Sequence, residues 1–168
     1  MKERTFAAAH MYKRPSLSKE QALQKVRHYC AYQERCHSEV REKLYSFGLR
    51  KTDVEDALST LIEENYLNEE RFAGLFAGGH FRTKQWGRIR IRYELKQKQV
   101  GDYCIRKALA VIDEVTYEET LAGLARKKWD SLTGESDRFV RQRKVQSYLL
   151  QKGYEPDYVT RALASLKT

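Results

Sequence analysis

Residues 40–61 read VREKLYSFGLRKTDVEDALSTL, and the chain uses this pattern three times. The second version is IRYELKQKQVGDYCIRKALAVI at 91–112, and the third is VQSYLLQKGYEPDYVTRALASL at 145–166. The three segments align with one another without a gap. Self-similarity at a period of about fifty residues is typical of proteins built from stacked helical units. The repeat therefore decides the fold class before any single element is considered.

The positions that match between the three segments are apolar and have helical spacing. Val40 and Leu44 head two columns four residues apart, and a later set recurs at i, i+3, i+4 and i+7. Such spacing places each set on one face of an α-helix. Gly48 and Gly153 lie between the two sets and are typical of helix ends, whereas the middle segment has Gln99 there. The sequence predicts helix–turn–helix pairs near 38–64, 89–113 and 141–167.

A further helix is predicted upstream of each pair. Ser18 with Gln21, and Thr116 with Glu119, have the spacing of a capping box, and Asn68 is a favourable N-cap residue. We therefore predict an all-α fold of three tandem three-helix, helix-turn-helix-like repeats in an elongated, curved array. The assigned ranges are 1–17 for a basic N-terminal tail, and 18–67, 68–114 and 115–168 for the first, second and third repeats.

Two irregular places are also predicted. Gly78 and Gly79 fall inside the first helix of the second repeat, where each costs about 1 kcal/mol relative to alanine. We expect that helix to fray, bend or pack closely there. Residues 130–140 read as a longer loop inside the third repeat. No sustained period-two alternation and no Asn-Gly or Asp-Gly hairpin signal occurs, which argues against a sheet.

The chain is basic, and its charge is unevenly distributed. Thirty-two lysines and arginines outnumber 23 acidic residues, for a net charge of +9. The net charge is +3 in the tail, −1 in the first repeat, +4 in the second and +3 in the third. An excess of this kind favours an anionic partner, and nucleic acid is the first candidate.

Several classes of protein are excluded by what the sequence lacks. Three cysteines without paired spacing argue against a disulfide framework or a zinc site and favour a reducing compartment. No segment approaches the roughly 18 apolar residues of a membrane span. Phosphate-loop, dinucleotide, metalloprotease and nucleophile-elbow motifs are all missing. We predict a cytoplasmic binding protein with no enzymatic activity, no cofactor and no metal.

The densest positive segment is RTKQWGRIRIRYELKQK at 82–98, which contains a single acid, Glu94. On a helix, Arg88, Arg92 and Lys96 would form a stripe able to follow a phosphate backbone. Trp86 and Tyr93, in the same segment, are interpreted as core-packing residues. Basic side chains also gather in the third repeat. The predicted nucleic-acid or filament contacts are Lys84, Arg88, Arg90, Arg92, Lys96, Lys98, Arg126, Lys127, Lys128, Arg141, Arg143 and Lys144.

Three stretches resemble motifs of the RecX family and occur in the family's order. They are RCHSEVREKLYSFGL at 35–49, LIEENYLNEERFA at 61–73 and GRIRIRYELKQKQV at 87–100. The resemblance extends from about residue 18 to 166, nearly the whole chain. Within the motifs, Phe72, Ile91 and Leu95 are core by pattern. Arg90 is the better candidate for contact with a partner.

The resemblance implies a modulator, usually an inhibitor, of the RecA recombinase, with no enzymatic activity of its own. It places the protein in homologous recombination, DNA repair and the SOS response. Such proteins bind along the groove of the RecA–DNA filament and limit its growth and its ATP-driven strand exchange. The implied partners are the RecA filament and single-stranded DNA, with double-stranded DNA as a second nucleic acid, and we expect a monomer.

Two other functions remain open at the level of sequence. Small three-helix units with a turn between the last two helices also describe helix-turn-helix DNA readers. A tandem, sequence-specific DNA-binding protein is therefore the alternative. A scaffold that contacts no nucleic acid is the third hypothesis.

Overall fold

A computed structural model describes residues 16–166, and within that range the chain forms nine α-helices and no strand. The predicted all-α fold of three-helix repeats is confirmed, and the three helix pairs begin and end within a few residues of their expected bounds. The helices are α1 (Lys19–Tyr32), α2 (His37–Ser46), α3 (Lys51–Glu63), α4 (Glu69–Lys84), α5 (Arg88–Gln97), α6 (Asp102–Ala110), α7 (Glu114–Asp130), α8 (Arg138–Lys152) and α9 (Pro156–Ser165).

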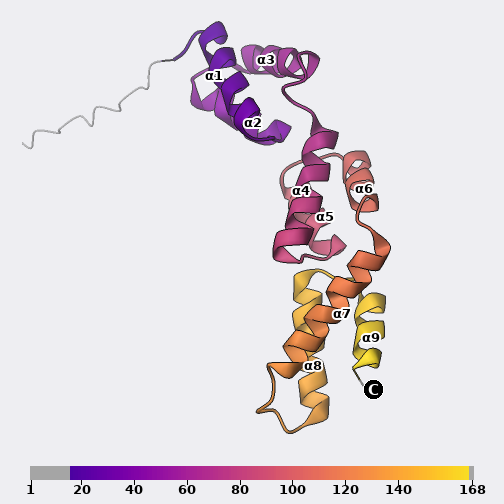
Figure 1. The fold of residues 1–168 in the computed structure, drawn as a ribbon. Coiled ribbons are helices and arrows are strands. Elements are labelled where there is room, and N and C mark those ends of the chain that lie inside the picture. The colour runs from indigo at the N-terminus through magenta and orange to yellow at the C-terminus, as the bar shows by residue number, and fades with distance from the viewer. Residues whose placement is uncertain (1–15, 167–168) are drawn as a thin grey trace, which may run out of the picture.

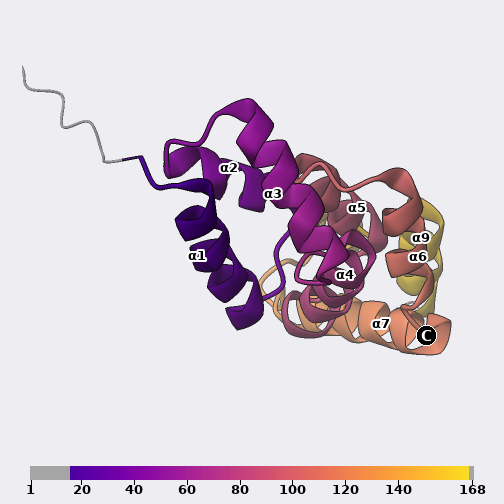
Figure 2. The ribbon, with the colours of Figure 1, turned by 90° about the horizontal axis from the view of Figure 1, so that it is seen from above.

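The helices are grouped in threes along an elongated, curved array (Figure 1). Seen from above, α1 and α2 lie to one side of α4 and α7 (Figure 2). Most of the predicted basic tail, 1–17, lies outside the described residues. The tail and the boundaries between the three repeats stay predictions.

Side-chain caps explain where the first helix of each repeat begins. The Ser18–Gln21 capping box is present, and the Asn68 side chain accepts the Arg71 N–H at 2.8 Å. The predicted box of Thr116 with Glu119 is wrong. The cap of α7 is Asp113, whose carboxylate accepts the Thr116 N–H at 2.8 Å, so the helix begins at Glu114. An aspartate is as good an N-cap as a threonine, and this one lies three residues earlier.

The predicted irregularities differ in outcome. A connection between α7 and α8 is present, although it is shorter than expected and spans residues 131–137. The fraying expected at Gly78 and Gly79 is not found, because α4 continues to Lys84. A Cβ on Gly78 would lie 2.9 Å from Arg82 Nη1, whereas no heavy atom lies within 4 Å of one on Gly79. The same helix buries Phe72 and Phe81 on its inner face. Tertiary packing therefore outweighs the low helix propensity of the two glycines.

The turns inside the three helix pairs share one left-handed residue. Gly48 has φ +84° and Gly153 has φ +91°, which confirms their predicted role as helix-ending residues. Gln99 adopts φ +60° at the equivalent position, although it carries a side chain. The middle turn therefore keeps the geometry of the other two without the glycine.

The core is divided into two clusters. One is formed by α1–α3 and the residues that follow, from Ala22 to Leu67, and includes the fully buried Val40 and Leu44. The other runs through α4–α9 without interruption, and its only member from the first repeat is Cys36. The second and third repeats therefore form one hydrophobic unit, whereas the first has a core of its own.

Successive repeats are stacked through one recurring polar contact, which we call the joint. In each joint, the carbonyl just before the left-handed turn residue accepts a hydrogen bond from an earlier part of the chain. The three pairs, donor first, are Leu17 N with Phe47 O at 3.0 Å, Ser38 Oγ with Lys98 O at 2.8 Å, and Gly87 N with Lys152 O at 2.9 Å. The segment before α1 thus occupies, on the first repeat, the place that a preceding repeat takes in the other two joints.

The joint between the second and third repeats is the tightest for the backbone. A Cβ on Gly87 would lie 2.2 Å from the Gly153 carbonyl oxygen and 2.4 Å from the Tyr154 nitrogen. The Ile89 N–H also donates to Gly153 O at 3.0 Å. Only glycine allows the two backbones to approach this closely.

Gly87→Ala should destabilise the protein by about 1–3 kcal/mol, because the methyl group meets backbone that cannot move aside. The matched control is Gly123→Ala in α7, where no heavy atom lies within 4 Å of the added carbon. That change should stabilise the helix by about 1 kcal/mol. Denaturant unfolding measures both. Equal effects of the two substitutions would contradict the steric account of the joint.

Candidate filament and nucleic-acid interface

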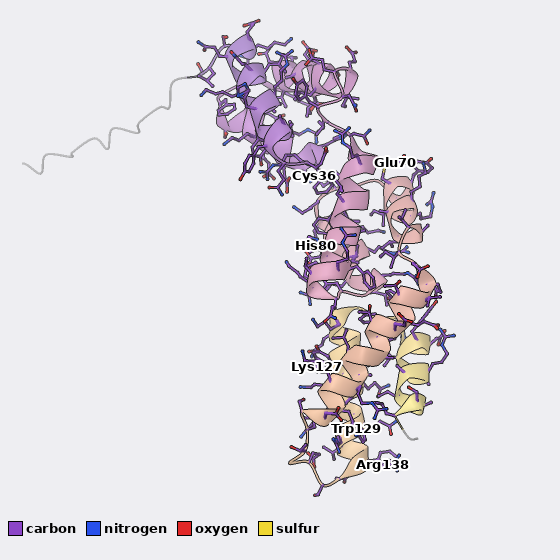
Figure 3. All side chains as sticks on the ribbon, in the orientation of Figure 1. Cys36, Glu70, His80, Lys127, Trp129 and Arg138 are labelled. Carbon is purple, nitrogen blue, oxygen red and sulfur yellow. The ribbon has the colours of Figure 1, made fainter. Side chains whose placement is uncertain are left out.

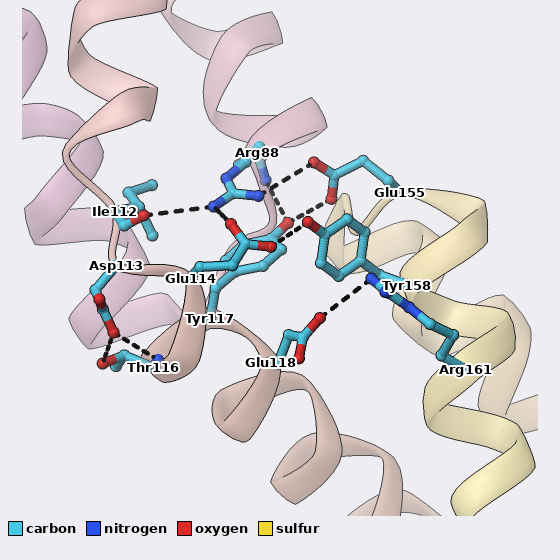
Figure 4. A network of polar contacts seen from close by, with 10 residues as sticks. All are labelled: Arg88, Ile112, Asp113, Glu114, Thr116, Tyr117, Glu118, Glu155, Tyr158 and Arg161. Carbon is cyan, nitrogen blue, oxygen red and sulfur yellow. Dashed lines mark hydrogen bonds and ion pairs between the residues drawn. The ribbon is translucent and has the colours of Figure 1, made fainter.

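Arg88, the first residue of the predicted stripe, is engaged inside the molecule. Its side chain is 17% exposed, and Nη2 lies 2.7 Å from the Glu114 carboxylate. The guanidinium stands 4.0 Å over the ring of Tyr117 and 4.0 Å from Glu155 (Figure 4). These contacts join the start of α5 to α7 and α9. Arg88 therefore connects the second repeat to the third.

Two tyrosines complete this network. The Tyr117 hydroxyl donates to Glu155 at 2.6 Å and accepts the Arg88 backbone N–H at 3.0 Å. Burial, and then the bond to Glu155, raise the pKa of Tyr117. The Tyr158 hydroxyl donates to Glu114; this bond and the Arg88 guanidinium lower the pKa of that carboxyl. Each hydroxyl and charged group in this network therefore has a partner. A phosphate could bind the Arg88 guanidinium only by displacing the Glu114 carboxylate.

Other predicted contacts are engaged too. Lys98 Nζ lies 2.5 Å from Glu39 across the joint between the first and second repeats, and Lys96 Nζ lies 3.3 Å from Asp102. The Arg141 guanidinium donates twice to the Trp129 carbonyl, at 3.0 and 2.6 Å, and stacks on its ring at 4.2 Å. Of the predicted stripe, Arg92 alone is exposed without an ion pair within 4.0 Å among residues 16–166. The stripe is thus not a uniform phosphate-binding surface.

A different set of predicted residues comes together on α7 and α8. Lys128, Arg143 and Lys144 line a groove beside Tyr148. The Lys152 ammonium lies 5.8 Å from the Tyr148 ring and donates to the Lys84 carbonyl at 2.9 Å. Charge therefore continues from the third repeat onto the second. We call this surface the α8 face; it comprises Lys84, Arg90, Lys128, Arg143, Lys144, Tyr148, Gln151 and Lys152.

Arg90 reaches the same surface from α5. Its guanidinium donates to the Gln151 carbonyl at 3.4 Å and lies 4.4 Å over the Trp86 ring. Trp86 packs against the core, as predicted. Tyr93 does not, because 60% of it is exposed, and its predicted core role is wrong. It lies two residues from Ile91, whose buried face points elsewhere on the helix.

Arg126 and Lys127 stand apart from the groove. Both are exposed on α7, and neither lines the groove beside Tyr148. Figure 3 labels Lys127 on this helix. Sequence reasoning missed Tyr148 and Lys152. The signal was available, because Lys144, Tyr148 and Lys152 are spaced four apart on α8 and lie along one helix face.

Among residues 16–166, no helix combines the length and the apolar character needed to cross a membrane.

Comparison with known proteins gives one consistent result. Residues 68–109 match the family model described as "RecX, second three-helix domain", and 116–163 match "RecX, third three-helix domain". A "Regulatory protein RecX" from Clostridium perfringens is 33% identical over 71% of this chain and 56% of its own length. One from Prosthecochloris aestuarii is 29% identical over 88% of this chain and 94% of its own length. The match thus spans just over half of the Clostridium relative.

Solved structures agree on the fold. The crystal structure of RecX from Lactobacillus salivarius superposes with a TM-score of 0.82, covering 89% of this chain and 96% of the other, at 22% identity. A second, titled "Crystal structure of regulatory protein RecX", has a TM-score of 0.77 and covers 83% of this chain and 68% of the other, at 26% identity.

Substitutions should distinguish basic residues that act in packing from those that are available to bind nucleic acid. Arg88→Ala should lower stability, because it leaves Glu155 and Tyr117 at the joint without their cation, and should leave the salt dependence of single-stranded DNA binding nearly unchanged. Lys128→Ala with Arg143→Ala should leave stability unchanged and reduce the log–log salt slope by about 1.4 if both contact phosphates of a single strand. Denaturant unfolding and salt titrations measure the two. The reverse pattern would place the interface on the α5 stripe.

Proposed function

The chain belongs to the RecX family, and from this we propose that it is a regulator that binds the RecA–DNA filament and mostly inhibits it. The proposal includes slower ATP hydrolysis, filament extension and strand exchange by RecA. It also includes direct contact with single-stranded DNA and action as a monomer in the cytoplasm. The observation that carries it is the α8 face, a cationic surface that crosses from the third repeat to the second.

The distribution of charge supports contact through the second and third repeats. Lys128 and Arg143 have no ion pair within 4.0 Å among residues 16–166, and Arg143 is exposed. Cations in this condition are available to phosphates or to acidic protein surfaces, and their attraction depends on salt. The first repeat has a net charge of −1 and is a weaker candidate for this role.

The array's shape supports binding to a polymer rather than to a single globular partner. An elongated row of repeats presents an extended surface, which repeat proteins commonly use for binding. Contacts spread over two rigidly joined repeats can engage neighbouring protomers of a helical filament at once. The second contact then forms at a high effective concentration, which raises the overall affinity.

The joints weaken the alternative of a tandem helix-turn-helix DNA reader. Such a reader places the N-terminus of its second helix in the major groove. Here an acid lies in the first turn of each equivalent helix, Asp53 in α3, Asp102 in α6 and Asp157 in α9. In the α5–α6 and α8–α9 turns, the carbonyls of Lys98 and Lys152 also accept hydrogen bonds from the preceding repeat. Carboxylates in the first turn of these helices would repel DNA phosphates.

The test measures single-stranded-DNA-dependent ATP hydrolysis by the RecA of the same organism. The wild-type protein should slow it at sub-stoichiometric to equimolar amounts. Lys128→Glu with Arg143→Glu should raise the half-inhibiting concentration about tenfold or more, because each reversal replaces an attraction by a repulsion of about 1 kcal/mol. Lys51→Glu, an exposed charge reversal in the first repeat, is the matched control and should change little.

Order of addition separates the two modes of inhibition. Stronger inhibition of growing filaments than of preformed ones would indicate that extension is limited, whereas equal inhibition would indicate binding along the groove. If RecA turnover is untouched at saturation while duplex DNA is bound with base-sequence preference, the regulator proposal fails and the DNA-reader alternative replaces it.

A further inference from the structure

The groove on the α8 face combines an apolar side and a cationic side. It measures about 510 Å³ and lies between the end of α7 and the middle of α8. Leu132, Val140 and the Tyr148 ring give it an apolar side. Lys128, Arg143 and Lys144 give it a cationic side, with Ser147 and Gln151 as polar groups between them.

The Tyr148 side chain presents its ring to the groove and is not fully buried in the core. It is half-buried and packs against the hydrophobic cluster of the second and third repeats, which fixes its position. The ammonium groups of Lys128 and Lys152 lie 5.3 and 5.8 Å from its ring centroid. Cations this close are attracted to the aromatic ring, and they could also pair with the phosphate of a nucleotide whose base stacks there.

The balance of charge at the groove is positive. Its one acidic neighbour with a defined contact is Glu135, which lies 2.6 Å from Lys144 and has its pKa lowered by that lysine. Lys128 and Arg143 have no ion pair within 4.0 Å in the described part of the chain. The groove therefore offers two available cations next to an aromatic ring.

We propose that this groove binds one unpaired nucleotide of a single strand, its base stacked on Tyr148 and its phosphates contacting Lys128 and Arg143. The inference rests on the proposed function, because it specifies how the third repeat would meet the DNA of a filament. A duplex keeps its base faces covered by stacking and cannot supply this contact, whereas an unpaired base can. An acidic peptide would satisfy the cations and leave the ring without a defined partner.

The experiment measures binding of the full chain to a short fluorescent oligothymidylate by anisotropy. Tyr148→Leu, which keeps an apolar side chain and removes the ring, should weaken binding about 5- to 150-fold, the range expected for losing one base–aromatic stack. Tyr148→Phe, which keeps the ring, should bind within about twofold of wild type. Tyr103→Leu is the matched control, because Tyr103 is an exposed tyrosine with Lys107 5.3 Å from its ring, outside the groove.

An abasic oligomer of the same length isolates the stacking. Wild type and Tyr148→Leu should bind it equally, since no base is present to stack. Unfolding curves and circular dichroism of Tyr148→Leu check that the groove is intact. Rescue by Tyr148→Phe serves the same purpose if the leucine variant is less stable.

Several outcomes would overturn the inference. They are an unchanged affinity of Tyr148→Leu for oligothymidylate, an equal loss on the abasic oligomer, no binding of oligothymidylate by wild type, or polyglutamate binding with the same dependence on Tyr148. The last would assign the groove to an acidic peptide.

Two outcomes separate the groove from the proposed function. Inhibition of RecA by wild type, together with normal DNA binding by Tyr148→Leu, would reject the groove alone. Loss of stacking in Tyr148→Leu with RecA unaffected by any variant would reject the proposed function alone.

Discussion

The backbone contact between Gly87 and the turn at Gly153 is the constraint on which the functional half of the molecule depends. Two segments of the backbone approach there without a side chain between them, and the N–H groups of Gly87 and Ile89 donate to the carbonyls of Lys152 and Gly153. The approach brings the start of α5 against α7 and α9, where Arg88 meets Tyr117 and Glu114. It also brings Lys84 beside Lys152, so that charge from two repeats forms one surface.

The arginines and lysines of the second and third repeats divide by environment. Arg88 and Arg141 lie against aromatic rings and bond to acidic or carbonyl oxygens, so they act in packing. Removing such a cation leaves desolvated partners behind, which is costly. Lys128 and Arg143 lie at the surface with fewer partners, so little interaction energy is lost when they turn toward an anion. Residue type alone does not distinguish the two roles.

The first and third repeats depart from the joint geometry in different ways. On the first repeat, the N–H of Leu17 donates to Phe47 O, as the N–H of Gly87 donates to Lys152 O at the joint between the second and third repeats. In the third repeat, α8 begins one turn earlier, relative to its matched columns, than α2 and α5. In that added turn, the N–H of Arg141, the position equivalent to Gly87, donates to Asp137 O within its own helix.

Sequence alone determined the repeat, the helix pairs and the buried columns, because a 3.6-residue period and matched apolar positions act locally along the chain. It also located the turns at Gly48 and Gly153. The start of α7 was misjudged because Asp113 and Thr116 are both good caps, and in the structure the Asp113 carboxylate accepts the Thr116 N–H. The helical spacing of Lys144, Tyr148 and Lys152 was also present in the sequence. Tertiary structure alone decided that Arg88 faces inward, that Tyr93 faces outward, and that Lys152 meets Lys84 of the second repeat. Those outcomes depend on which helix faces meet at the joint, and contacts between distant residues, 26 positions apart for Arg88 with Glu114 and 68 for Lys84 with Lys152, leave no periodic trace in one sequence.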